Sequence, residues 1–489
     1  MLLINYDVGL LALGADLVNS GGLLYRDIHT EMFPGAYLIL ASCFKVFGTS
    51  QFVSQVATAC VIIAVGGLIL ILSRRFIDGW LALLPASITI VMGAYTSPYF
   101  SHHWCSLFFV LLYAICLVRL VSLGTKTPAA IFGAGVVGGL AVLCYQVQVV
   151  PVLAGLLAAA SLLRSKGEAF RFSGWLLFGL TTVAFGLLGF LVFTGTLNHF
   201  FESTLKFVFF QYGSVNQVAY GFSNFQAITV SAFNFPWRIA SATPFGILKC
   251  APIIVAVAIC FSIFKQRSFS NCLKSAPVVL LIAVAFGLLI GESHKPDMRL
   301  LIWAQPVMLI AVFYFADRVQ YQYRSARILV PLCAMLVSIG LVLDAKVFLY
   351  SFPETATEYS TNRGVVRSVS NLKILEILCK RLKPGEKLLV YPYDTGVMFL
   401  SGGRFPSRYP VLHYGYHTES QFREVIEDME KSGVRYVVWN RLFDNPNFSE
   451  LGFPSYKQVS QDKLIMEPYL KDHFEPAGQC GEYLLLKRK

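Results

Sequence analysis

Three residues near the start of the chain, Asp7, Arg26 and Asp27, have side chains that could carry out group transfer. A carboxylate within hydrogen-bond reach of a hydroxyl group can take its proton as a general base. A guanidinium can hold a phosphate through two parallel hydrogen bonds. Because these side chains stand against apolar segments instead of in a soluble domain, residues 1–50 predict chemistry at a membrane surface.

A pair of histidines, His102 and His103, lies in the short polar segment 97–104. The pair could bind a phosphate or a metal ion, although adjacent side chains point in different directions on a helix. The alternative is that this segment anchors the chain at the membrane interface beside Trp104, since Trp is enriched there. Both interpretations place the segment at one end of the membrane part.

Two later segments are also rich in polar groups. Residues 291–299 contain acids, a histidine and Arg299, and form either a solvated turn or part of a site near Asp7. Residues 399–417 contain Arg404 and Arg408 among glycines, prolines and aromatic residues. Aromatic faces and guanidinium groups suit sugars and phosphates, so the second segment is either a sugar or headgroup site or a solvated turn.

The composition places the chain among polytopic membrane proteins. Hydrophobic residues make up 56% of the sequence, charged residues only 14%, and the mean hydropathy is +0.61, outside the range of soluble proteins. The formal net charge of +12 does not indicate nucleic-acid binding. Much of the positive charge lies in loops between apolar segments, and no basic motif with interleaved aromatic residues stands out.

The apolar segments predict ten transmembrane helices. A crossing needs about 20 apolar residues, and such segments recur from residue 51 to residue 346. The fourth and fifth form one apolar run that is too long for one helix, so we interpret it as a hairpin. The predicted crossings are residues 51–73, 79–97, 104–123, 128–145, 148–163, 174–194, 243–264, 275–291, 300–317 and 327–346.

Positive charge alternates between the short loops of the membrane part. Arg74 with Arg75, and Arg119 with Lys126, are examples of loops expected on the cytoplasmic side. The N-terminal stretch, the long loop 195–242 and the C-terminal tail then face outward. Because the chain starts almost at the first outward loop, we expect a further helix ahead of it, unless the short end itself is pushed across the membrane.

Three regions follow from this pattern: residues 1–50 as a first outward loop, residues 51–346 as the transmembrane module, and residues 347–489 as a soluble outward domain. We expect amphipathic helices in the first region. In the third, the segments 387–391 and 434–439 resemble buried strands, each after a charged helical stretch, which predicts a small α/β domain.

The long loop 195–242 has an aromatic, amphipathic first half, predicted to lie as a helix in the membrane interface. There it would either gate a lipid entering from the bilayer or simply cover the bundle. Most of the cysteines fall in apolar helices and act as small hydrophobic residues. Cys379 and Cys480 both lie in the outward domain, where an oxidising compartment would allow them to pair.

The order of several short motifs resembles the GT-C superfamily of membrane glycosyltransferases. The nearest branch includes bacterial protein O-mannosyltransferases, lipid A aminoarabinose transferases and rhizobial lipopolysaccharide sugar transferases. The resemblance covers the first outward loop, the whole membrane part and a loop of the C-terminal domain. The matching motifs are Asp7-Val8-Gly9, Tyr25-Arg26-Asp27, Phe33-Pro34-Gly35-Ala36-Tyr37, Phe44-Lys45-Val46-Phe47-Gly48, the Gly-rich crossing that ends in Tyr145-Gln146, and 399–409.

This resemblance implies an inverting transferase that moves a sugar from a polyprenyl-phosphate donor to a glycolipid, envelope glycan or protein hydroxyl. Asp7 matches the catalytic aspartate of the superfamily. Arg26 and Arg299 are the cations that adjoin motifs and would face the lipid phosphate. Relatives commonly have an acid where Val8 stands and a lysine where Tyr145 stands, so this chain lacks those charges.

Asp27 would orient a substrate hydroxyl or a cation, or it would pair with Arg26 or cap a helix. Gln146, His102, His103, Arg404 and Arg408 complete the expected substrate-binding set. No cofactor is required, and a divalent cation stays an open alternative.

The resemblance also implies a multi-pass protein of the plasma or inner membrane, with its active face and C-terminal domain in the periplasm or outside the cell. The expected partners are the lipid-linked donor, the acceptor and membrane lipids. One alternative is a transporter or flippase of a lipid-linked sugar, which would carry charged groups inside its helices, where acids are almost absent here. Another is a non-catalytic envelope protein that retains this fold.

Overall fold

The computed structural model describes most of the chain. The described residues are 8–122, 127–163, 165–212, 234–266, 276–292, 298–351, 356–368, 371–383, 385–444 and 460–489.

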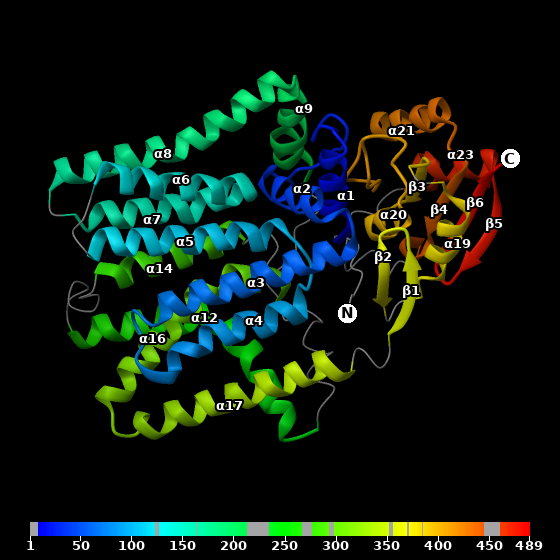
Figure 1. Cartoon of the computed structure of the whole chain (residues 1–489). Helices are drawn as coiled ribbons and strands as arrows, with labels where there is room; N and C mark the ends of the chain where they lie inside the picture. Colours follow the sequence, from blue (N-terminus) through cyan, green and yellow to red (C-terminus); the bar gives the residue numbers. More distant parts are fainter. Residues whose placement is uncertain are drawn as a thin grey trace.

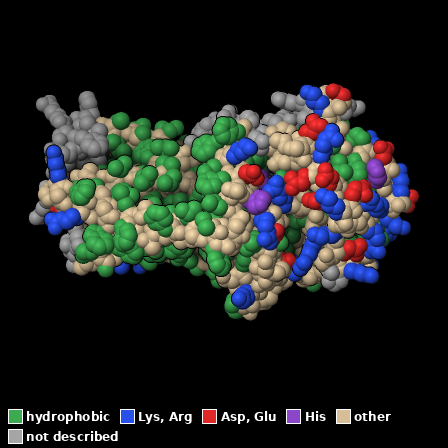
Figure 2. All heavy atoms as spheres, turned by 90° about the horizontal axis from the view of Figure 1, so that it is seen from above, with side chains coloured by type: hydrophobic (Ala, Val, Ile, Leu, Met, Phe, Trp, Pro, Cys, Tyr) green, Lys and Arg blue, Asp and Glu red, His purple; other side chains and the backbone are tan. Residues whose placement is uncertain are grey.

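The molecule consists of a bundle of long helices and a smaller α/β domain at one end of that bundle (Figure 1). Two short helices near the N-terminus, α1 (Val8–Asn19) and α2 (Gly35–Phe47), lie between the two parts. Charged side chains gather over the α/β domain, whereas the flank of the bundle is largely apolar, with basic groups at its far end (Figure 2). This distribution is the one expected of a membrane protein.

Six helical segments in the described residues are long and apolar enough to cross a membrane. Helices also occur at the other expected crossings, but they are shorter, so the count of ten crossings is not confirmed. The six are α3 (Gln51–Ser73), η1 (Gly79–Leu83) with α4 (Leu84–Thr96), α5 (His102–Ser122), α8 (Lys166–Phe193), α12 (Trp237–Gln266) and α17 (Ala326–Lys346), the last running on into η5 (Val347–Ser351).

The long fourth apolar run forms two helices, as expected. Helix α6 (Pro128–Cys144) ends at Tyr145, the 3₁₀ turn η2 (Gln146–Gln148) follows, and α7 (Val149–Ser161) begins directly after it. Helix α6 packs closely on α8, because a Cβ atom at Gly135 would lie 2.1 Å from the carbonyl oxygen of Leu176. The glycines of this crossing therefore permit backbone contact between helices.

The last crossings include a break that the sequence pattern did not predict. Helix α14 (Ala276–Gly291) is continuous, whereas the expected crossing 300–317 is divided into α15 (Met298–Ala304) and α16 (Pro306–Gln322). Pro306 lacks the backbone N–H that a continuous helix would need there, and it stands in the first turn of α16, where proline is tolerated. Residue Trp303 sits just before this break.

The first half of segment 195–242, the long outward loop of the predicted topology, is helical, as expected. It comprises α9 (Leu197–Phe200) and two π-helical turns, η3 (Phe201–Lys206) and η4 (Val208–Tyr212). Phe209 and Phe210 are exposed, while Phe200 and Phe207 are buried against the first outward loop and the C-terminal domain. One face of this segment therefore packs on protein and the other is free to contact lipid.

The C-terminal domain has the expected alternation of strands and helices. Its sheet has the order β3-β4-β6-β5, with β3 and β4 parallel and the other pairs antiparallel. A separate hairpin, β1 (Thr357–Thr361) and β2 (Gly364–Ser368), precedes it. The remaining elements are α19 (Lys373–Arg381), β3 (Leu388–Tyr391), α20 (Thr395–Ser401), α21 (Glu419–Ser432), β4 (Tyr436–Asn440), η6 (Arg441–Asp444), η8 (Gln461–Lys463), α23 (Met466–His473), β5 (Phe474–Cys480) and β6 (Tyr483–Arg488).

Local sequence explains the ends of the helix that supports the polar site. Thr418 caps α21 through its side chain, and Gln421 returns a bond to the backbone of Thr418, which is a capping box. Gly433 ends the same helix in the left-handed conformation, with φ of 61°. Cys379 and Cys480, which an oxidising compartment would allow to pair, are both free thiols in this structure.

Candidate functional site

Residues 8–50, which belong to the first outward loop of the predicted topology, are held between the bundle and the C-terminal domain. Helix α2 begins against the end of α6, because a Cβ atom at Gly35 would lie only 2.7 Å from the carbonyl oxygen of Leu143. Next to this contact, Nε2 of Gln146 donates to the carbonyl oxygen of Glu31 at 2.9 Å. Only glycine allows such a close approach, which gives the Phe-Pro-Gly motif a physical role.

A cage of aromatic and histidine rings forms where α5, α6, α14 and α15 meet. His103 Nδ1 lies 3.2 Å from Oε1 of Glu292, and both side chains are nearly fully buried. The His103 ring stacks on Trp303 with 4.1 Å between centroids and 4° between planes. His102 and Tyr145 complete the cage, with their rings 4.6 Å apart. The expected pair of histidines thus lies in a buried polar cluster, next to the break at Tyr145.

Two polar atoms beside this cage have no hydrogen-bond partner within the described residues. They are Nε1 of Trp303 and Oε1 of Gln146, each shielded from solvent. An unsatisfied buried polar atom costs about 1–3 kcal/mol, so such atoms usually have a further partner. The indole N–H can donate to a hydroxyl or phosphate oxygen of a sugar donor, and the amide oxygen can accept from a sugar hydroxyl.

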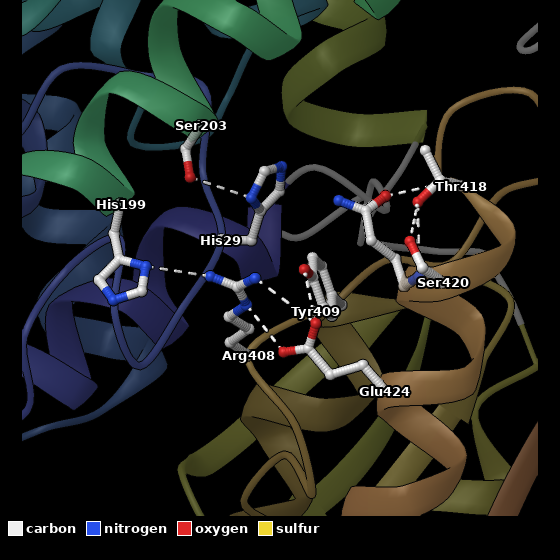
Figure 3. A network of polar contacts seen from close by, with 9 residues as sticks. His29, His199, Ser203, Arg408, Tyr409, Thr418, Ser420 and Glu424 are labelled. Carbon is white, nitrogen blue, oxygen red and sulfur yellow. Dashed lines mark hydrogen bonds and ion pairs between the residues drawn. The ribbon is translucent and has the colours of Figure 1, made fainter.

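A second polar cluster joins the long outward loop to the C-terminal domain (Figure 3). Nε of Arg408 donates to Oε1 of Glu424 at 3.0 Å, and its Nη1 donates to Nδ1 of His199, on α9, at 3.2 Å. The Tyr409 hydroxyl donates to the other oxygen of Glu424 at 3.1 Å. The backbone N–H of His29 donates to the carbonyl oxygen of Arg408 at 2.6 Å. We call these residues, with Ser203 and His417, the interdomain network.

His29 is the first-loop member of the interdomain network. Its Nδ1 is hydrogen-bonded to Oγ of Ser203, 3.0 Å away, while its Nε2 is buried without a partner in the described part of the chain. Its ring lies 5.3 Å from the ring of Tyr409 and 6.0 Å from that of His417. The free ring nitrogen is a position where a hydroxyl group of a bound molecule could be held.

Burial keeps the histidines around this network neutral. It lowers the pKa of His29 to about 4, with a smaller contribution from the guanidinium of Arg408. Burial also lowers the pKa of His413 to about 3. The pKa of His417 falls well below its usual value, again through burial first and then through His29 and His413. A neutral imidazole can donate one hydrogen bond and accept another, so these rings can hold polar groups near pH 7 without carrying charge.

The two clusters are linked by three consecutive residues of the first outward loop. The backbone N–H of His29 donates to Arg408, and the carbonyl oxygen of Glu31 accepts from Gln146. Gln146 lies beside the ring cage at the end of the bundle that adjoins the C-terminal domain, and we call this end the bundle mouth. The hydroxyl of Tyr416 also lies 3.5 Å from Oε1 of Glu31. Residues 29–31 therefore separate the bundle mouth, next to Glu31, from the interdomain network, next to His29.

Arg26 and Asp27 form a local pair on the surface. Nε of Arg26 donates to Oδ1 of Asp27 at 2.7 Å, and the backbone N–H of Leu23 donates to Oδ2 at 2.8 Å. The hydrogen bond from Arg26 lowers the pKa of the Asp27 carboxyl. Of the roles weighed for Asp27, the structure contains the pair with Arg26.

Three expected site residues belong to neither cluster: two are not fully described by the structure, and one lies elsewhere on the surface. Asp7 lies outside the described residues; α1 begins at the next position, and Gly9 packs against the backbone of Thr395 in the C-terminal domain. Arg299 lies in α15, where the structure describes its backbone but not its side chain. Arg404 is exposed at the edge of the domain, where its backbone bonds to Glu386 and Leu388.

Asp394 is a buried acid that sequence reasoning missed. Its Oδ1 accepts from the N–H of Val397, capping α20, and its Oδ2 accepts from the hydroxyl of Tyr483 at 2.6 Å. Burial raises the pKa of this carboxyl to about 6. An aspartate three residues before an apolar helical run is a capping signal that could have revealed it. Its neighbour Thr395 contacts the start of α1.

Within the described part of the chain, no group of three or more His, Cys, Asp or Glu side chains could hold a metal ion. The histidines of the two clusters pair with carboxylates, hydroxyls and aromatic rings instead. The arrangement that is present can hold a phosphate or hydroxyl group at the bundle mouth, and can bind polar groups beside His29 and Arg408.

No family model matches this sequence, and no curated protein is similar to it in sequence. Solved structures share its fold. The structure of ArnT from Cupriavidus metallidurans bound to undecaprenyl phosphate has a TM-score of 0.57 and 12% identity, and the match covers 99% of this chain and 93% of that one.

An archaeal oligosaccharyltransferase is also similar in fold. AglB from Archaeoglobus fulgidus, in complex with an inhibitory peptide and a dolichol-phosphate, has a TM-score of 0.54 and 11% identity, covering 98% of this chain and 70% of that one. The chain therefore shares its fold with these two proteins, as the resemblance implied, although the ten expected crossings are not confirmed.

Proposed function

We propose that this protein is a GT-C glycosyltransferase that takes a sugar from a polyprenyl-phosphate donor and transfers it to a hydroxyl group. The observation that carries the proposal is the fold match to ArnT over 99% of the chain, in a structure of that protein bound to undecaprenyl phosphate. The match to AglB, in complex with a dolichol-phosphate, is consistent with the same kind of lipid.

The reaction is an inverting substitution at the anomeric carbon of the sugar. The acceptor oxygen forms a bond to that carbon while the bond to the lipid phosphate breaks, and the lipid phosphate leaves with the bonding electrons. The acceptor hydroxyl must give up its proton, and we assign Asp7 as the base that takes it. This assignment rests on the motif, since Asp7 lies outside the described residues.

The donor side of the site is proposed at the bundle mouth. The ring cage around His103 offers an aromatic wall for a sugar, and the unsatisfied atoms of Trp303 and Gln146 offer a donor and an acceptor for its oxygens. Arg299, which opens α15 in the same region, is proposed as the cation for the lipid phosphate. His102 and Tyr145 would contact the donor from the opposite wall.

The acceptor side is proposed at the interdomain network. Arg408 is half-buried and held in place by Glu424 and His199, so its guanidinium is fixed before any ligand arrives. His29, whose Nε2 is buried without a partner in the described part of the chain, belongs to the same network. We propose an acceptor that carries several hydroxyl or phosphate groups, such as a glycolipid, an envelope glycan or a protein hydroxyl. Arg404, Arg26 and Asp27 lie outside this arrangement in the described chain.

The test is sugar transfer by the purified full chain from radiolabelled polyprenyl-phosphate sugars to a membrane extract. We expect transfer by wild type and loss of at least a hundredfold in the Asp7→Asn variant at equal thermal stability. Gln146→Leu should raise KM for the donor without removing folding. His473→Gln, a change of an exposed histidine on α23, is the matched control and should transfer normally.

The same preparation separates the two competing functions. A flippase in sealed proteoliposomes would make the lipid-linked sugar accessible on the other side without forming a glycosylated product. Equal transfer by wild type and Asp7→Asn would move the base to another residue. Absence of transfer with every donor, together with absence of translocation, would favour the non-catalytic protein.

A further inference from the structure

A pocket of about 220 Å³ lies at the end of the bundle far from the C-terminal domain, where α3 and α5 end beside each other. Three arginines and four aliphatic residues line it. They are Ile71, Leu72, Arg74, Arg75, Ile115, Val118 and Arg119. Because Arg119 is on a different helix from the other two, the three guanidinium groups come together only in the folded bundle.

The three arginines of this pocket are not neutralised by the protein. Among the described residues, none of them forms an ion pair, and no acidic side chain is among the residues that line the pocket. Three like charges that converge repel one another, and this repulsion is relieved by an anion. The planar guanidinium, with its fork of donors, matches the oxygens of a phosphate better than any other side chain.

The other half of the pocket is suited to a hydrocarbon chain. Ile71 is 55% exposed and belongs to the apolar membrane face of α3, whereas Leu72 and Val118 form a buried floor. The pocket lies at the end of two membrane helices, which is the depth of lipid headgroups. Positive charge in loops on this side orients a membrane protein, but that rule does not require the charges to converge on one cavity.

We propose that this pocket binds the phosphate headgroup of an anionic phospholipid, with one acyl chain along Ile71 and the end of α3. The lipid would belong to the leaflet at this end of the bundle, opposite the C-terminal domain. Arg74, Arg75 and Arg119 would surround its phosphate. This site is separate from the proposed sugar donor site and does not depend on it.

The test is a titration of the full chain, purified in a neutral detergent, with phosphatidylglycerol, using native mass spectrometry to count bound lipids. A triple variant, Arg74→Gln with Arg75→Gln and Arg119→Gln, should bind about 100-fold more weakly, since each basic side chain near an anionic headgroup contributes about fivefold. The matched control changes Arg318, Arg324 and Arg327 to Gln, which removes equal charge from the end of α16, the turn after it and the start of α17, outside the pocket. The control should change the affinity less than threefold.

A conservative variant keeps the test valid if the triple variant fails to fold. Arg119→Lys retains the charge that guides membrane insertion but loses the forked donors, and it should weaken binding about fivefold. The proposal is overturned if both triple variants lose affinity equally, or if phosphatidylcholine binds as tightly as phosphatidylglycerol. It is also overturned if millimolar inorganic phosphate displaces the lipid, because the pocket would then be a site for free phosphate.

Discussion

Acidification should open the contact between the first outward loop and the C-terminal domain. The pKa values of His29 and His413 are about 4 and 3 because both rings are buried, whereas a solvated histidine has a pKa of about 6.5. The opened or unfolded state therefore binds more protons than the closed state below pH 6.5. Since the folded-state pKa values are depressed, the stability that neutral rings provide is present above pH 6.5 and declines as the pH falls toward 4.

The size of this effect follows from the two pKa values. At pH 5 a solvated imidazole is about 97% protonated, while the closed state keeps both rings largely neutral. Each ring then costs the closed state about 2 kcal/mol relative to neutral pH, or about 4 kcal/mol for both, as an upper bound. A change of this size is comparable to a large part of the stability of a typical domain.

Hydrogen–deuterium exchange of the full chain at pH 7 and pH 5, corrected for the intrinsic rates, measures this opening. Segments 27–33 and 405–418 should exchange at least tenfold faster at pH 5, whereas the strands of the sheet should not change. A variant with His29→Gln, His413→Gln and His417→Gln should lose most of this pH dependence, because burial lowers the pKa of all three rings, and His473→Gln, which alters an exposed histidine, should retain it. Equal protection at both pH values in the wild type would show that these rings are protonated without opening the contact, and would refute the reasoning.

Three further predictions concern contacts of the N-terminal segment and contacts within the C-terminal domain. Gly35→Ala should lower stability by about 1–3 kcal/mol in thermal scans, because its Cβ would meet the backbone of α6, while Gly133→Ala, with open space around it, should not. Asp394, whose pKa is raised to about 6, should make stability fall by about 2 kcal/mol as the pH rises from 4 to 6, and Asp394→Asn should remove this slope. Arg363→Gln should lower the free energy of unfolding by about 1.5–3 kcal/mol, because this side chain bonds to α1 from the β1–β2 turn. The control Arg367→Gln, on the exposed strand, should lower it by less than about 0.5 kcal/mol. Unchanged unfolding midpoints for the Gly35 and Arg363 variants would show that the two parts associate by other contacts.

Regular elements with a clear period could be predicted from the sequence. The charged stretch at 419–432 becomes α21 with those bounds, because its apolar positions recur at helical spacing and Thr418 and Gly433 supply the end signals. The hairpin at Tyr145 could also be predicted, because the apolar run is longer than a single helix needs to cross a membrane. The break before Pro306 was not predicted, because hydropathy alone does not distinguish one apolar helix from two.

The candidate site could be predicted only in part. The motifs located His102, His103, Gln146 and Arg408, all of which lie in the two clusters. The partners of these residues come from distant positions, because Glu292 is 189 residues from His103 and His199 is 209 residues from Arg408. No periodic pattern links such residues, so their pairing depends on the tertiary fold.

The position of the first outward loop bears on how the two sides of the site would act together. Glu31 is bonded to Gln146 at the bundle mouth, and His29 is bonded to Arg408 in the C-terminal domain, with one residue between them. That residue, Thr30, is fully buried and hydrogen-bonded to the Tyr37 hydroxyl at 2.8 Å, so the segment is fixed to α2. Because a short buried segment cannot absorb a shift at one end without moving the other, a donor that displaces Gln146 should also alter the environment of His29. If donor binding changes exchange at 405–418 as well as at 143–148, this coupling exists, whereas a change confined to 143–148 would mean that the two sides bind independently.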